Sequence, residues 1–120
     1  MEPTVEQKSF QFAIQIVRLH RYLRVSKKEF VLSKQLLRSG TSIGANIHEA
    51  NYAASRADFI NKLQIALKEC YESDYWLGLF KDTKMITDSE YSDMYSKCSK
   101  IRVLLIASIT TAKEKDGEAK

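Results

Sequence analysis

Two histidines, two cysteines and several arginines are the residues of this sequence whose types and spacing suggest chemistry. His48 and Glu49 begin a pattern of zinc metalloproteases, in which a second histidine follows four residues after the first and binds the same metal ion. Position 52 is Tyr52, so the second ligand is missing. The other histidine, His20, stands alone in a separate segment. We therefore expect no metal site.

The two cysteines, Cys70 and Cys98, form no Cys-x-x-Cys motif. Each lies in an apolar stripe at helical spacing, where a cysteine usually serves as a small core side chain. A Cys–His catalytic pair depends on geometry that the sequence does not reveal, and no other feature favours one. Carboxylates occur singly or beside lysines, and the Glu-x-x-His pattern of di-iron bundles is absent. The sequence predicts a protein that is not an enzyme and uses no cofactor.

The basic side chains near the N-terminus have a regular spacing. Arg18, Arg21 and Arg24 are three residues apart, and Lys28 follows after four. On a helix this spacing gathers the charges within about one third of the circumference. The net charge is +4, and the whole excess lies in the first quarter of the chain. Such a stripe either holds an anionic partner, with Arg38 as a further member, or is a solvated helix face.

Helices must position these side chains. Apolar residues recur at alternating spacings of three and four along most of the chain, which is the helical period. Helix starts are indicated by capping boxes, in which Ser or Thr precedes an acid or amide by three positions: Thr4/Gln7, Ser26/Glu29, Ser55/Asp58 and Thr87/Glu90. The sequence predicts helices over residues 5–25, 27–53, 56–82 and 88–114, with a frayed tail over 115–120.

The predicted fold is all-α, an antiparallel up-down-up-down four-helix bundle, because the links between the segments are short. A length of 120 residues suits a single domain over residues 1–120. The longest apolar run, Val103 to Ala107, is far too short to span a bilayer. The N-terminus lacks the pattern of a secretory signal. Two cysteines without an export signal predict reduced thiols and a cytoplasmic protein.

A run of small residues from Arg38 to Asn46 interrupts the second segment. Glycine inside a helix costs about 1 kcal/mol relative to alanine, so Gly40 and Gly44 need a reason. Close approach of a neighbouring helix is one. An anion-binding loop is another, although the glycine–lysine spacing of a P-loop is absent. We favour packing, and the predicted helix-packing or subunit-contact residues are Gly40, Ser42, Gly44, Asn46, Glu49 and Trp76.

The apolar faces are wider than a monomeric bundle needs. The first segment carries Phe10, Ile14 and Val25 away from its main stripe, and the third carries Tyr75 and Trp76 near its end. Surplus apolar surface of this kind often marks a subunit interface, although a well-filled core is the alternative. We expect a homo-oligomer.

The run from Leu32 to Phe80 resembles the bacterial four helix bundle protein family. Relatives in that family include proteins encoded in intervening sequences of large-subunit ribosomal RNA genes and, more distantly, the accessory variability determinant of diversity-generating retroelements. The resemblance covers roughly Lys8 to Lys81 and departs at Ala50-Asn51, where many members have a glycine after the glutamate. The matching pieces are Gln35-Leu36-Leu37-Arg38, Ser42-Ile43, Gly44-Ala45-Asn46-Ile47, Glu49-Ala50 and the helix from Asp58-Phe59 to Trp76-Leu77.

The resemblance implies a four-helix bundle that assembles into a ring-shaped homo-oligomer, with a pentamer as the expected form. It implies no established enzymatic activity. The retroelement relatives bind RNA and a reverse transcriptase, so RNA and a nucleic-acid-processing protein are the partners that the resemblance suggests.

Two functions therefore remain open. The first is binding of structured RNA or other nucleic acid, and the predicted contacts are Arg18, Arg21, Arg24, Lys28 and Arg38. Binding would depend on shape and charge, because no RRM, KH or helix-turn-helix signature is present. The second is a protein-interaction scaffold or accessory subunit that recruits another protein, such as a reverse transcriptase, and has no nucleic-acid affinity of its own.

Overall fold

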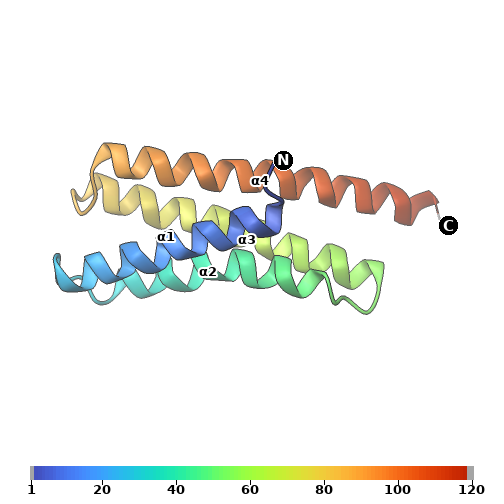
Figure 1. Ribbon diagram of the computed structural model, residues 1–120, viewed down its shortest axis with the longest axis horizontal. Coiled ribbons are helices and arrows are strands. Elements are labelled where there is room, and N and C mark those ends of the chain that lie inside the picture. The colour runs from blue at the N-terminus through green and yellow to red at the C-terminus, as the bar shows by residue number, and fades with distance from the viewer. Residues whose placement is uncertain (1, 119–120) are drawn as a thin grey trace.

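The computed structural model describes residues 2–118, which contain four helices and no strand. The helices are α1 (Val5–Val25), α2 (Leu32–Ala50), α3 (Arg56–Asp82) and α4 (Asp88–Glu118). Short links make successive helices antiparallel, and the helices lie along the longest axis of the molecule (Figure 1). The all-helical prediction is confirmed, and the arrangement is that of a four-helix bundle. None of the described helices is long and apolar enough to cross a membrane.

Reciprocal capping explains where α1 and α4 begin. Thr4 Oγ1 accepts a hydrogen bond from the Gln7 N–H, and Gln7 Oε1 accepts one from the Thr4 N–H. Thr87 and Glu90 exchange the same two bonds before α4. Each box satisfies N–H groups that have no partner inside the helix.

The start of α3 uses a partial box. Ser55 Oγ accepts a hydrogen bond from the Asp58 N–H, while Asp58 Oδ2 accepts one from the Ala54 N–H, 3.3 Å away. The bounds of α1 and α3 are the ranges expected from the sequence. α4 is longer than expected, because it continues through the tail to Glu118. The last part of that predicted frayed tail, residues 119–120, lies outside the described residues.

The predicted start of the second helix at residue 27 is wrong. Lys28 has a left-handed backbone (φ 56°), which interrupts a helix, and α2 begins at Leu32. The carboxylate of Glu29 accepts the N–H groups of Leu32 and Ser33 at 3.0 and 2.7 Å. Glu29 therefore caps α2 from outside, instead of closing a box with Ser26. The end of α2 also falls short of residue 53.

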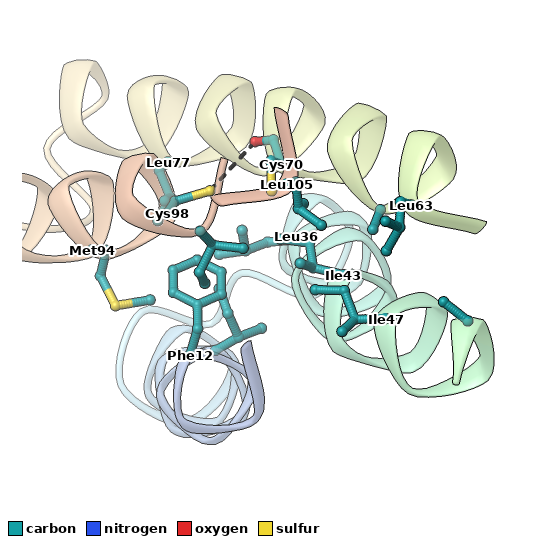
Figure 2. Close-up of a cluster of buried hydrophobic side chains, with 14 of the residues drawn as sticks. Phe12, Leu36, Ile43, Ile47, Leu63, Cys70, Leu77, Met94, Cys98 and Leu105 are labelled. Carbon is teal, nitrogen blue, oxygen red and sulfur yellow. Dashed lines mark hydrogen bonds between the residues drawn. The ribbon is translucent and has the colours of Figure 1, made fainter. Parts of the chain in front are cut away.

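One apolar core runs through the bundle, and all four helices contribute to it (Figure 2). Phe12, Leu36, Leu77 and Leu105 are among its fully buried side chains. Cys98 is also fully buried, and its thiol donates to the carbonyl oxygen of Cys70 across the α3–α4 contact, 3.6 Å away. Both cysteines are free thiols in core positions.

The α1–α2 contact is close because α2 presents glycines to α1. A Cβ atom on Gly40 would lie 2.6–2.8 Å from side-chain atoms of Ile16, and a Cβ on Gly44 would lie 3.3 Å from Ser9 Oγ. On another side of α2, the hydroxyl of Ser73 on α3 donates to that of Ser39 at 3.0 Å, and both are buried. The small-residue run therefore lies within a helix that approaches two neighbours closely.

An ion pair closes the α3–α4 contact near the surface. Arg102 Nη1 donates to Asp74 Oδ2, Nη2 donates to Ser99 Oγ, and the guanidinium lies near the rings of Tyr71 and Tyr95. Burial raises the pKa of Asp74 above its usual value, and the positive charge of Arg102 opposes that shift. Breaking this pair would leave a partly buried charge without its partner.

The seam between α1 and α4 is the most open side of the bundle. α1 has 21 residues and α4 has 31, and the N-terminal end of α1 lies about midway along α4 (Figure 1). The contact of α1 with α4 is also the smallest of the four helix–helix contacts. Open grooves therefore form along this seam.

Candidate nucleic-acid interface

The three predicted arginines of α1 are all exposed, and they spread over about one third of the helix circumference. A step of three residues turns the side chain by about 60°, which adds up over the series. Arg18 lines grooves on the α4 side of α1. Arg21 is exposed and lies between Arg18 and Arg24 around the helix. Arg24 lies toward α2, where burial and then the charges of Arg24 and Lys34 lower the pKa of His20. The arginine stripe thus borders three surfaces.

Lys28 and Arg38 lie apart from this set. Lys28 follows the end of α1 and belongs to the link before α2. Arg38 points from α2 to α3, where its guanidinium contacts Glu69 at 3.0 Å and also Glu72. These two carboxylates compensate its charge, so the structure does not bring Arg38 to the arginines of α1.

A basic groove lies between α1 and α4 and has a volume of about 520 Å³. Phe12 and Ile14 form its apolar part. Its polar lining consists of Lys8, Gln11, Gln15 and Arg18 from α1 with Lys97 and Lys100 from α4. We call it the α1–α4 groove. Lys8, Arg18 and Lys100 form no ion pair with a carboxylate between residues 2 and 117, so their charges are available to an external anion.

An acidic groove continues along the same seam. Gln15 lines both grooves, and Glu90 and Asp93 line the second. Asp93 Oδ2 accepts hydrogen bonds from Lys97 Nζ at 3.1 Å and from Gln15 Nε2 at 3.3 Å, and these bonds lower the pKa of Asp93. Asp93 is therefore ionised at neutral pH and compensates part of the Lys97 charge. Of these two grooves, the basic one is the better site for an anion.

Three lysines of the α1–α4 groove were missed by reasoning from the sequence. Lys8 precedes the arginine series, and Lys97 and Lys100 lie in a segment whose basic and acidic residues balance. The signal that could have found the α4 pair is their spacing of three, which places both on one side of a helix. Only the contact between α1 and α4 sets them opposite Lys8 and Arg18.

Glu49 and Trp76 belong to the α2–α3 side of the bundle. Lys62 Nζ donates to Glu49 Oε1 at 2.9 Å, which links the two helices. The Trp76 indole N–H donates to Glu72 at 3.2 Å, and Glu72 also binds Arg38. Both residues therefore make contacts within one subunit.

The predicted packing residues Gly40 and Gly44 face α1, as described above. Their neighbours Ser42 and Asn46 bond within α2. Ser42 Oγ donates to the carbonyl of Arg38, and Asn46 Nδ2 donates to the carbonyl of Ser42 at 2.8 Å. These side chains satisfy their polar groups locally.

The remaining reactive residue types make structural contacts. His48 Nδ1 lies 2.8 Å from Glu6 Oε1, and Asn51 donates to the other oxygen of Glu6, so both lower the pKa of that carboxyl. The contact with Cys70 and burial raise the pKa of Cys98 far above its usual value, which keeps the thiol protonated. Within residues 2–117, no group of three His, Cys, Asp or Glu side chains is placed to hold a metal ion.

A family model agrees with this fold. The model describes the 23S rRNA-intervening sequence protein and matches residues 1–107. This chain belongs to that family. The resemblance found in the sequence is thereby confirmed, and the match extends beyond Lys81 into α4, where it includes both groove lysines of that helix.

A solved structure of a similar protein supports the same fold. A protein of unknown function from the S23 ribosomal protein family of Bacteroides thetaiotaomicron is 55% identical to this member of the 23S rRNA-intervening sequence protein family. The alignment covers 88% of this chain and 98% of that chain, with a TM-score of 0.88. No protein of curated function matches.

Proposed function

We propose that this family member is a self-assembling, non-enzymatic protein of the cytoplasm that binds structured RNA in the α1–α4 groove. The observation that carries the proposal is the set of cations in that groove, of which Lys8, Arg18 and Lys100 have no carboxylate partner between residues 2 and 117. Cations that neutralise phosphates release counterions from the nucleic acid, and this release drives binding. The described residues that line this groove are lysines, an arginine, two glutamines and apolar side chains, and these groups suit the binding of an anion.

The groove suits contacts to the RNA backbone. Gln11 and Gln15 offer amide groups that can hydrogen-bond phosphate oxygens or 2′-hydroxyls beside the cations. Proteins recognise A-form RNA mostly through such backbone contacts. Self-assembly supports the same proposal, because each copy would add one groove and linked sites bind with greater avidity. A pentameric ring stays the prediction drawn from the resemblance.

A protein-interaction scaffold is the second candidate. Exposed aromatic side chains favour it, among them Phe10 on α1 and Tyr71 and Tyr75 on α3. Aromatic residues are enriched among the anchors of protein interfaces. In this case a nucleic-acid-processing protein such as a reverse transcriptase would dock on these residues, and the groove would have no affinity for RNA.

Fluorescence anisotropy of a labelled RNA hairpin, titrated at several salt concentrations, tests the proposal. Binding should have a dissociation constant of roughly 1 μM at low salt and should weaken steeply as salt rises. The double variant R18A/K100A removes two phosphate contacts. It should reduce the slope of log affinity against log salt by about 1.5 to 2.

A charge-matched control separates the groove from general attraction. Lys68 on α3 and Lys113 on α4 are exposed and do not line the groove, so K68A/K113A should keep the slope of the unmodified protein. Equal losses in both double variants would contradict a site in the groove. No binding at the lowest salt would reject RNA as the ligand and favour the scaffold.

A further inference from the structure

The outer side of α1 carries apolar side chains that the described part of the subunit leaves partly or largely exposed. Phe10, Ile14 and Val17 are 66%, 38% and 39% exposed. Their spacings of four and three residues place them on one side of the helix. Arg21 and Arg24 continue this side toward the end of α1 and are also exposed. We call these five residues the α1 face.

The outer side of α4 carries a second uncharged stripe, opposite the core residues Met94, Cys98, Ile101 and Leu105. Its residues are separated by alternating fours and threes, and they are Ser92, Ser96, Ser99, Val103, Ile106 and Thr110. The stripe extends over about five turns, and a solvent-facing side of that length normally carries charges. Its period is that of a helix which packs on another helix. We call it the α4 face, and its Val103 is 64% exposed.

We propose that the α1 face of one copy packs antiparallel on the α4 face of a second copy. This inference rests on the self-assembly proposed above and names the two surfaces that perform it. The two faces belong to different helices, so the contact is heterologous, and each copy keeps one face for the next neighbour. Such contacts form a closed ring when the rotation between neighbours closes.

The shapes of the two faces match in this direction. When Phe10 lies opposite Ile106, an antiparallel pairing sets Ile14 beside Val103 and Val17 opposite Ser99. The large apolar side chains of α1 then meet the aliphatic half of the α4 face. The serine half of that face meets the arginine end of the α1 face, where small side chains leave room for long ones.

The same register also pairs opposite charges. Arg24 falls one helical turn, about 5.4 Å, from Asp88 at the start of α4. Both side chains are exposed, and neither forms an ion pair within the part of the chain that the structure describes. A long arginine side chain spans such a gap. The α1–α4 groove lies beside these faces and shares Ile14 with the α1 face, while its cations Lys8 and Lys100 belong to neither face.

Sedimentation velocity of two variants, alone and mixed, tests the contact. F10E damages the α1 face and V103E damages the α4 face, and both replace largely exposed side chains, so circular dichroism should stay unchanged. Each variant alone should be monomeric, because no intact pair of faces remains. An equimolar mixture should form a dimer, because the intact α1 face of one variant meets the intact α4 face of the other.

The control and the contrary outcomes are distinct. V31E changes an exposed apolar residue outside both faces and should assemble like the unmodified protein. An F10E variant that still self-associates would overturn the proposal, as would a mixture that stays monomeric. An unmodified protein that is monomeric at every concentration would reject self-assembly itself, whereas RNA binding is measured independently of it.

A charge exchange tests the register. R24E and D88R should each weaken assembly by about fivefold, the size expected of one exposed ion pair. The double variant R24E/D88R should recover most of the loss, because every junction regains opposite charges. A double variant as weak as the sum of the two single changes would contradict the antiparallel register.

Discussion

At the scale of single residues, the absence of one methyl group decides how closely α1 and α2 approach. A Cβ atom on Gly40 would meet Ile16 well inside van der Waals contact. A Cβ on Gly78, in the interior of α3, would meet no atom within 4 Å. The same substitution at the two positions should therefore have opposite effects on stability.

We expect G40A to lower the free energy of unfolding by about 1 to 3 kcal/mol, because overpacking outweighs the gain in helix propensity. G78A should raise it by up to about 1 kcal/mol, because it gains propensity without a clash. Urea unfolding followed by circular dichroism measures both values. A stabilised G40A would contradict the close approach of α1 to α2.

At the scale of elements, each helix begins where a side-chain oxygen accepts backbone N–H groups. The start of α2 depends on Glu29, which lies in the link before the helix. Burial acts to raise the pKa of Glu29, but the hydrogen bonds from Leu32 and Ser33 outweigh it and hold the pKa below the usual value of 4.5. The cap therefore needs the ionised carboxylate.

E29A should lower the free energy of unfolding by about 1 kcal/mol near neutral pH, the usual effect of losing a helix cap. The pKa of Glu29 is lower in the folded chain than in the unfolded chain, so its contribution is complete above the unfolded value. It is lost as the pH falls through the folded value. Denaturant titrations of both proteins at several pH values should show the difference shrinking in acid. A difference independent of pH would mean that Glu29 acts through packing.

At the scale of the whole molecule, α4 reaches further than the helix beside it. Ala112 is the last core residue of α4, and α1 starts only at Val5, about midway along α4 (Figure 1). The end of α4 therefore has fewer neighbours than its centre. Helical segments with few buried contacts open more often than the core.

Hydrogen exchange should reveal this difference. Amides from Lys113 to Gly117 should exchange at least about tenfold faster than those from Cys98 to Leu105, because local opening of the helix end breaks no core contact. Mass spectrometry of short peptides measures both segments in the same sample. Equal protection would show that the end of α4 is covered by a contact absent from the single subunit.

Local patterns explain how much of the fold could be predicted. The Thr4/Gln7 and Thr87/Glu90 boxes work through contacts three residues apart, so sequence alone locates them. The capping box predicted at Ser26 is absent, because the Glu29 carboxylate accepts backbone N–H groups of α2 instead. The left-handed backbone of Lys28 turns the chain between the two helices. The local sequence is compatible with a helix start at Ser26 or at Leu32, and the packing of the link selects Leu32.

The candidate site depended on contacts that sequence patterns do not contain. The spacing of three drew attention to Arg18, but the cations opposite it in the groove come from α4, about 80 residues later in the chain. The sequence predicts Arg38 as a further member of the basic stripe. In the structure, Glu69 and Glu72 on α3 compensate its charge. Charge counting by segment therefore identified one wall of the groove only.

By itself, the sequence determined four amphipathic helices, their order and an antiparallel bundle, because periodicity and capping act over one or two turns. The tertiary structure alone decided which charges are compensated, where the bundle stays open and which apolar faces remain uncovered. These properties depend on the lengths and mutual rotation of the helices. The close contact between Gly40 and Ile16 fixes the rotation of α1 against α2, and α1 starts about midway along α4 (Figure 1). Both features depend on contacts between residues that are far apart in the chain.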